Sequence, residues 1–276
     1  MKQTLYSEQN DHKWNILNAT TLKLIAVFFM FLDHIHQMFV HIGAPIWLTM
    51  VGRMVFPIFL FASAESFHYT HSKKNYLQRL LFAGWGITLF TVALQSILPN
   101  QQVVLMNNAF ATFFVTGLYM LFWDIFVDGI QNRNPVQVGK AVLYGILQFL
   151  GVVPLLFVAG LSSNEAISFP VLRILITLAM LVPNVIAIEG GVAMVALGVS
   201  FYIFRKHRVI QIAILLVLSA VTYFIGDSIQ WMMCFAAIPI ALYNGERGKG
   251  MKHFFYLFYP LHIGVLYLIS TMDFYY

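Results

Sequence analysis

The chain has 276 residues, of which 60% are hydrophobic and only 10% are charged. Soluble domains carry about a quarter charged residues, so this composition excludes a soluble globular protein and predicts an all-α membrane protein with many spans. The net charge of +5 does not indicate nucleic-acid binding, because excess Lys and Arg in a membrane protein usually mark cytoplasmic loops.

The polar segment 1–21 lacks the apolar core and the small-residue cleavage site of a signal peptide. We therefore expect an uncleaved first span and a single transmembrane domain over residues 1–276. Apolar stretches separated by turn residues predict the following spans: Leu22–His41, Ile46–Phe67, Leu80–Leu98, Asn108–Phe126, Ala141–Leu161, Ile210–Ile225, Ile229–Tyr243 and His253–Ser270.

The stretch Phe169–Arg205 is too long for one ordinary span and is interrupted at Pro183-Asn184 and at Glu189-Gly190-Gly191. It is either two short spans or one span with a re-entrant piece. One crossing gives nine spans and places the basic loops 68–79, 128–140, 205–208 and 244–252 on the cytoplasmic side with the N-terminus. Two crossings give ten spans and place the last two basic loops outside, so charge favours nine.

The first predicted span carries Lys23, Asp33, His34, His36 and His41. A charge in the bilayer centre costs about 2.5–3.5 kcal/mol on insertion scales, so this helix has more than an anchoring role. Helical geometry places Lys23 and His34 about 20° apart on one face and about 16 Å apart along the axis. We predict that this face, continued by Ala26, Met30, Gln37 and His41, forms the wall of a polar cavity.

His34 is the candidate general base, because the unperturbed pKa of imidazole suits proton transfer near neutral pH. Asp33 cannot reach the neighbouring ring but can meet His36, three residues on. A histidine that only packs helices together is the alternative. A metal site at His34, His36 and His41 is not expected, because no thiolate or cluster of carboxylates joins them.

Each of the other polar residues in the apolar stretches has two possible interpretations, one structural and one functional. Arg53 and Glu65 lie about 18 Å apart on one helix, so each pairs with another helix, either structurally or at the site. Asn108, Thr112 and Thr116 make a stripe that favours interhelical hydrogen bonds or lines a cavity. His262 follows the kinking Pro260 as a possible second cavity imidazole. Lys73, Lys74 and Arg79 mark either topology or a phosphate clamp.

Several segments resemble the TraX family of bacterial membrane proteins: LKLIA…FLDHIH, GRMVFPIFLF with Glu65-Ser66-Phe67, YLQR, Asn108 with FATFFVTGL, and YNGERGKG…HFFYLFYPLH. The last segment is the most specific. This family is associated with N-acetylation of the F-pilin subunit and is similar to the wider membrane acyltransferase superfamily of about ten helices. The resemblance implies a bundle of that kind in a bacterial cell membrane.

The resemblance also implies acetyl-CoA as the acyl donor. Lys23 and His34 resemble the superfamily's first-helix basic residue and histidine, although Lys23 stands where arginine is usual. Lys73, Lys74 and Arg79 resemble its acyl-CoA-binding residues, and we expect Arg247 to join them in holding the phosphates. In this reading His34 acts with Asp33, and Arg53 or His262 stabilises the oxyanion or orients the acceptor. The acceptor, a protein, a glycan or a small molecule, is not determined.

Two alternatives remain open. A proton-coupled transporter with an intramembrane His/Asp site is favoured by the interrupted stretch Phe169–Arg205, because broken helices build transport sites. A structural or assembly subunit would tolerate substitution of His34 and His262 together.

Overall fold

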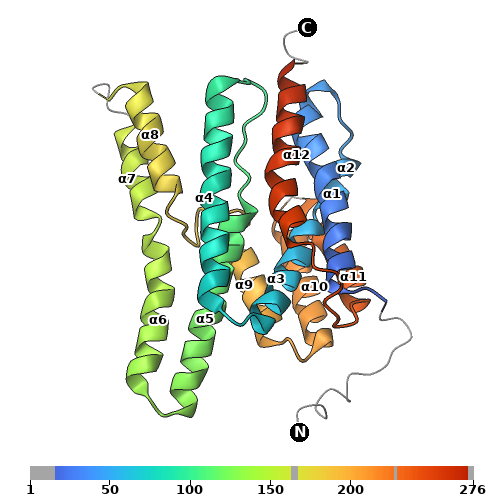
Figure 1. The fold of residues 1–276 in the computed structure, drawn as a ribbon, viewed down its shortest axis with the longest axis vertical. Coiled ribbons are helices and arrows are strands. Elements are labelled where there is room, and N and C mark those ends of the chain that lie inside the picture. The colour runs from blue at the N-terminus through green and yellow to red at the C-terminus, as the bar shows by residue number, and fades with distance from the viewer. Residues whose placement is uncertain (1–15, 163–166, 227–228, 273–276) are drawn as a thin grey trace.

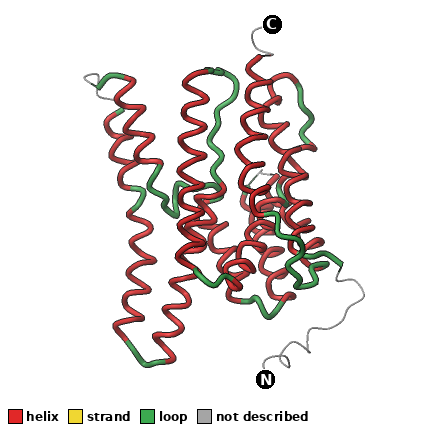
Figure 2. Tube along the Cα trace, viewed as in Figure 1, coloured by secondary structure: helices red, strands yellow, loops and turns green. Residues whose placement is uncertain are grey.

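The computed structural model describes residues 16–162, 167–226 and 229–272. Within these ranges the chain is an α-helical bundle whose only strand-like pairing is a single bridge between Leu17 and Tyr243 (Figures 1 and 2). The helices are α1 Ala19–Phe39, α2 Trp47–Gly52, α3 Val55–Tyr69, α4 Lys73–Ile97, α5 Ala109–Gln131, α6 Pro135–Leu150, α7 Val153–Leu161, α8 Phe169–Met180, α9 Gly191–Ile203, α10 Arg208–Ile225, α11 Ala237–Ala241 and α12 Lys252–Met272, with 3-10 turns η1 Val40–Ile42 and η2 Ile229–Ala236.

Capping residues move several boundaries away from the predicted ones. Ser72 accepts from the backbone N–H of Asn75, so α4 begins at Lys73 rather than Leu80. Asn134 caps α6, and Pro135 takes its first position, where a missing N–H costs nothing. The predicted loops 68–79 and 128–140 are therefore largely helical. The predicted span Ile46–Phe67 is divided into α2 and α3 at Arg53 and Met54.

The interrupted stretch Phe169–Arg205 is divided into two short helices, α8 and α9. Arg173 on α8 lies beside Val92 near the end of α4, and Leu181 accepts a hydrogen bond from Trp85 further down α4. Tyr202 on α9 bonds Asp124, which pairs with Lys73 at the start of α4. Seven helices of the described residues are long and apolar enough to span a membrane, whereas α8, α9 and η2–α11 are shorter apolar segments, so the choice between nine and ten spans stays a prediction.

The cations predicted to share one side do lie at one end of the bundle. Lys73, Arg205 and His68 are close together, as are Lys23 and Arg247. We call this the basic end, defined by Lys23, Lys73, Arg205, Arg208 and Arg247. The chain enters α1 here, because Leu17 is hydrogen-bonded on both sides to Leu242 and Asn244. Seven apolar helices of spanning length make this a multi-pass membrane protein.

Two non-helical segments, which we call the inward segments, lie part-way along the bundle: 98–108 runs inward from the end of α4 opposite the basic end, and 181–190 joins α8 to α9 at mid-height (Figure 2). Their backbone groups find partners inside the protein. The Gln95 amide exchanges hydrogen bonds with both backbone groups of Leu105, and Asn184 Oδ1 accepts from Ile186 and Ala187. Irregular backbone at membrane depth requires such internal partners.

The YNGERGKG segment is clasped onto the start of α1. The backbone N–H of Ala19 donates to the Glu246 carbonyl (2.8 Å), and Thr20 Oγ1 donates to the Lys249 carbonyl (2.6 Å). Gly248 has a left-handed φ of 70°, and a Cβ there would collide with the Asn18 side chain. Gly248 is thus required both by its backbone conformation and by close approach to α1.

We predict that Gly248→Ala lowers the thermal midpoint of the detergent-solubilised protein, because the left-handed backbone alone costs about 1–2 kcal/mol for an L-residue and the Asn18 contact adds to it. Gly250→Ala is the matched control, since a Cβ at Gly250 meets nothing within 4 Å. Equal midpoints for the two variants would contradict this account of the clasp.

Candidate functional site

Two histidines from distant parts of the chain meet in the interior. His34 on α1 and His262 on α12 are 4% and 5% exposed, and His34 Nδ1 lies 2.7 Å from His262 Nε2. The helices α1 and α12 pack along each other, which brings the two rings into register. Phe258 stacks on His262 with ring centroids 4.7 Å apart, and Tyr259 meets His34 edge-on. The pair is shielded on this side by aromatic rings.

The partners of the two rings determine where their protons lie. His262 Nδ1 is 2.7 Å from the Phe258 carbonyl, which only accepts, so His262 carries its proton on Nδ1. The Nε2 of neutral His262 is then an acceptor, and His34 donates to it from Nδ1. A neutral His34 consequently has its lone pair on Nε2. This is the arrangement that a general base requires.

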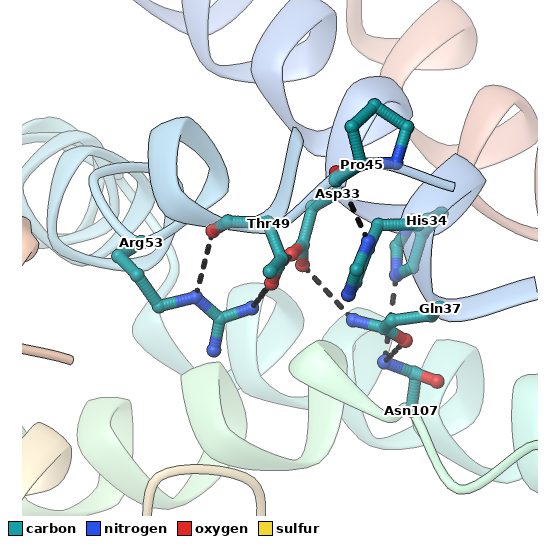
Figure 3. A network of polar contacts seen from close by, with 8 residues as sticks. Asp33, His34, Gln37, Pro45, Thr49, Arg53 and Asn107 are labelled. Atoms are coloured by element: carbon teal, nitrogen blue, oxygen red, sulfur yellow. Dashed lines mark hydrogen bonds and ion pairs between the residues drawn. The ribbon is translucent and has the colours of Figure 1, made fainter. Parts of the chain in front are cut away.

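A second chain of hydrogen bonds reaches His34 Nε2 from the other side (Figure 3). The Asp33 carboxylate only accepts, so Gln37 turns its Nε2 toward Asp33 Oδ2 (2.9 Å) and its oxygen toward Asn107. Asn107 Nδ2 donates to that oxygen (3.1 Å) and points its other N–H at His34 Nε2, 3.4 Å away. This chain independently requires an acceptor at Nε2, in agreement with the His262 side.

Asp33 is held by partners other than the predicted one. Arg53 Nη2 and Thr49 Oγ1 both donate to Asp33 Oδ1 at 2.6 Å (Figure 3). Arg53 thus pairs with another helix, as expected. The predicted meeting of Asp33 with His36 is wrong, because His36 Nδ1 lies 3.2 Å from the Pro45 carbonyl and Asp33 turns toward α2 instead.

The open polar wall predicted along α1 is not present in this structure. Ala26 and Met30, between Lys23 and His34, are 0% and 8% exposed, so neighbouring helices pack directly against this face. His41 does not continue the stripe, because α1 ends at Phe39 and His41 is exposed on η1. The polar side of His34 is the side of Asn107 and Gln37.

Sequence reasoning missed Glu189 as part of the site. It precedes the left-handed Gly190 and Gly191, which turn the inward segment 181–190 into α9. Its Oε2 accepts from the backbone N–H of Asn108 (3.2 Å) at the start of α5, where the helix dipole favours negative charge. Asp33, Arg53 and Tyr259 are close enough to act on it electrostatically. The residue as a whole is nonetheless exposed in the described structure.

The signal that could have found Glu189 was its position, a lone carboxylate beside two glycines inside an apolar stretch. Asn107 gave no signal of its own, because it stands in an ordinary polar turn sequence.

The predicted polar stripe on α5 divides in two. Asn108 and Thr112 bond other segments as expected, through Gly84, Thr88 and Glu189. Thr116 is fully buried and its hydroxyl has no hydrogen-bond partner.

The predicted donor-binding residues lie at the basic end, and they differ in availability. Lys23 Nζ is 3.4 Å from Ser66 Oγ and lies over the Phe255 ring, with Arg247 nearby. Lys73 forms an ion pair with Asp124, so its charge is already matched. Lys74 and Arg79 are exposed, and Arg79 lies close to the Tyr256 hydroxyl. Glu65 lies near Arg208 and Arg205, not at the histidine pair.

The model of the family described as TraX protein matches residues 18–270. The chain belongs to the TraX family. It is also 27% identical over 258 residues to a protein of Dichelobacter nodosus named "Probable fimbrial assembly protein FimC, serogroup H1", covering 90% of this chain and 94% of that protein. No solved structure matches.

The TraX match begins at Asn18, the residue that caps α1, and ends at Ser270, within the last turn of α12. It therefore spans both histidines, both inward segments and the clasp that holds the YNGERGKG loop on α1. The whole constellation around His34 lies inside the part of the chain that defines membership of the family.

We predict that Gly52→Ala in this TraX-family chain disturbs the Asp33 network. A Cβ at Gly52 would meet the Asp33 carboxylate, including Oδ1 at 2.7 Å, so α2 must move away from α1. Overpacking of this kind costs about 1–3 kcal/mol, measured as a lower thermal midpoint in detergent. Gly86→Ala is the control, because a Cβ there meets nothing within 4 Å. An unchanged midpoint for Gly52→Ala would show that α2 does not need this close approach.

Proposed function

We propose that this chain is a membrane-embedded acetyltransferase that moves an acetyl group from cytosolic acetyl-CoA to an amine or hydroxyl of a fimbrial subunit or another cell-envelope molecule. The observation that carries the proposal is the His34–His262 pair, which leaves an unprotonated His34 Nε2 on a polar side of the interior. Family membership and the fimbrial-assembly name of the D. nodosus relative support it.

His34 Nε2 is the proton acceptor in this mechanism. It takes the proton from the acceptor N–H or O–H as that atom attacks the thioester carbonyl, and it returns the proton to the departing CoA thiolate. The imidazolium formed in between still donates from Nδ1 to His262 Nε2, which in turn is oriented by the Phe258 carbonyl. His262 thus orients His34 and stabilises its charged form, as a carboxylate does in other histidine-based sites.

Asn107 is the group nearest to where the acceptor must bind. An acceptor that donates to His34 Nε2 replaces the Asn107 N–H there and releases it toward the reacting carbonyl oxygen, where a fixed donor stabilises developing negative charge. Asp33 and Arg53 act at one remove: through Gln37 they keep the amide nitrogen of Asn107 facing His34. We therefore assign these two a positioning role rather than a direct catalytic one.

The basic end is the docking face for the phosphates of the donor. In the described structure, four cations of this end have no carboxylate partner: Lys23, Lys74, Arg79 and Arg247. Lys73, by contrast, is paired with Asp124. The excess of Lys and Arg at this end supports a cytoplasmic location for it, by the positive-inside rule. The thioester arm reaches His34 along α1 by displacing Met30, whose unbranched side chain adapts its shape easily.

We predict that His34→Ala abolishes acetyl transfer, because loss of a general base costs about 10²–10⁴-fold in rate. His262→Ala should cost about 10–100-fold, the usual effect of losing the partner that orients a functional histidine. His262→Gln should recover part of that loss, since its amide oxygen can accept from His34 Nδ1.

The measurement uses membranes that contain each variant, labelled acetyl-CoA and an envelope fraction, with transferred label and free CoA as the two readouts. His41→Ala is the control for a histidine on the surface of the same segment. Full transfer by His34→Ala at normal membrane insertion would refute the mechanism.

A proton-coupled transporter is the second candidate, favoured by one observation. Two inward segments and the broken α8–α9 stretch bring Glu189 and the Asp33–Arg53 pair to the same interior region, as interrupted helices do in transport sites. Purified protein in liposomes separates the candidates. We expect CoA release that depends on an added acceptor, with no solute accumulation; solute uptake without CoA release would instead establish the transporter.

A further inference from the structure

An open groove of about 260 Å³ lies between α4 and α8, away from the histidine pair. Its walls are mostly apolar, with Leu89 and Val92 on α4 and Ile174 and Leu178 on α8. Leu89, Ile174 and Leu178 are 50%, 60% and 57% exposed, so the groove opens on the outside of the bundle, where acyl chains surround a membrane protein. It is not an internal cavity.

The charged end of the groove is formed by Arg173, and the polar Thr177 one turn further along α8 turns its hydroxyl to the Arg173 carbonyl. Arg173 and Ser96 lie near the end of the bundle opposite the basic end, whereas Leu89 and Leu181 lie deeper along α4. Trp85 lies next to the deep end, where its indole N–H donates to the carbonyl of the lining residue Leu181 at 2.7 Å. A groove with a charged end and mostly apolar walls matches an amphiphile, which has a polar head group and an apolar chain, better than a soluble metabolite.

Arg173 is an unusual cation in this molecule. Most Lys and Arg side chains of the described residues gather toward the basic end, and Arg53 is paired with Asp33. Arg173 lies in the other half, and in the described structure its guanidinium makes one hydrogen bond, from Nη2 to the Val92 carbonyl at 3.3 Å. No carboxylate pairs with it there. Its remaining N–H groups need an anionic acceptor, and a guanidinium matches phosphate geometry.

We propose that the α4–α8 groove binds an anionic phospholipid, with the phosphate on Arg173 and Ser96 and one acyl chain along Leu89, Leu178 and Leu181. The chemistry is that of basic pockets between helices at the cytoplasmic side of a membrane, which bind anionic head groups; here the cation lies at the other end of the bundle. The groove is connected to the candidate active site through α4, because the α4 turn that carries Trp85 also holds Asn108 through Gly84 and Thr88. A bound lipid would therefore brace the segment 181–190 that carries Glu189.

Trp85 next to the deep end of the groove provides a direct readout. The full chain is reconstituted in phosphatidylcholine bilayers containing a small fraction of phosphatidylglycerol with brominated acyl chains, which quench nearby tryptophans. The Trp85 signal is the difference between the wild type and Trp85→Phe. We expect quenching that corresponds to about fivefold enrichment of the anionic lipid at this site, the effect of one Arg near a membrane surface.

Arg173→Gln should remove the enrichment, and Arg173→Lys should keep most of it because the charge remains. Arg133→Gln, in the turn between α5 and α6, is the matched control for loss of a cation elsewhere and should change nothing. Equal quenching by brominated phosphatidylcholine at the same fraction, or unchanged enrichment in Arg173→Gln, would overturn the proposal. Because this assay does not measure acetyl transfer, its result is independent of the proposed function.

Discussion

The hydrogen bond between His34 and His262 is the interaction on which the interior of this protein depends. It joins the first and last described helices and, with the Phe258 carbonyl, decides which nitrogen of His34 is free. A buried polar group without a partner is costly, and more so where water is excluded. Each imidazole satisfies the other, and the one lone pair left over faces the polar side of the site.

Two chains of hydrogen bonds meet at the His34 ring, one at Nδ1 and one at Nε2, and they begin at very different groups. One begins at a backbone carbonyl of α12 and the other at the Arg53–Asp33 ion pair. The pair is part-buried, and Asp33 also accepts from Thr49 and Gln37, so several hydrogen bonds hold the carboxylate in place and orient the amides of Gln37 and Asn107. Asp33 and Arg53 therefore act on His34 by orienting the side-chain amides of Gln37 and Asn107, which stand between the ion pair and the ring.

The two inward segments explain how an apolar bundle can hold so many polar groups at depth. A continuous helix uses its backbone groups internally and offers only side chains to its neighbours. The segments 98–108 and 181–190 interrupt the helices, so that Asn107, Asn108 and Glu189 reach the interior beside α1 and α12. The start of α5 adds backbone N–H groups, one of which binds Glu189.

The sequence by itself determined the class of the protein, the approximate positions of its long apolar helices, the gathering of its basic loops at one end and the two histidines worth examining. These follow from hydropathy, charge and helical periodicity, which are local properties of the chain. It could not show that Asp33 turns to Arg53 rather than His36, that Met30 fills the expected cavity wall, or that Glu189 and Asn107 join the site. Those facts depend on contacts between segments far apart in the chain, and only the packing of α1, α2, α12 and the two inward segments decided them.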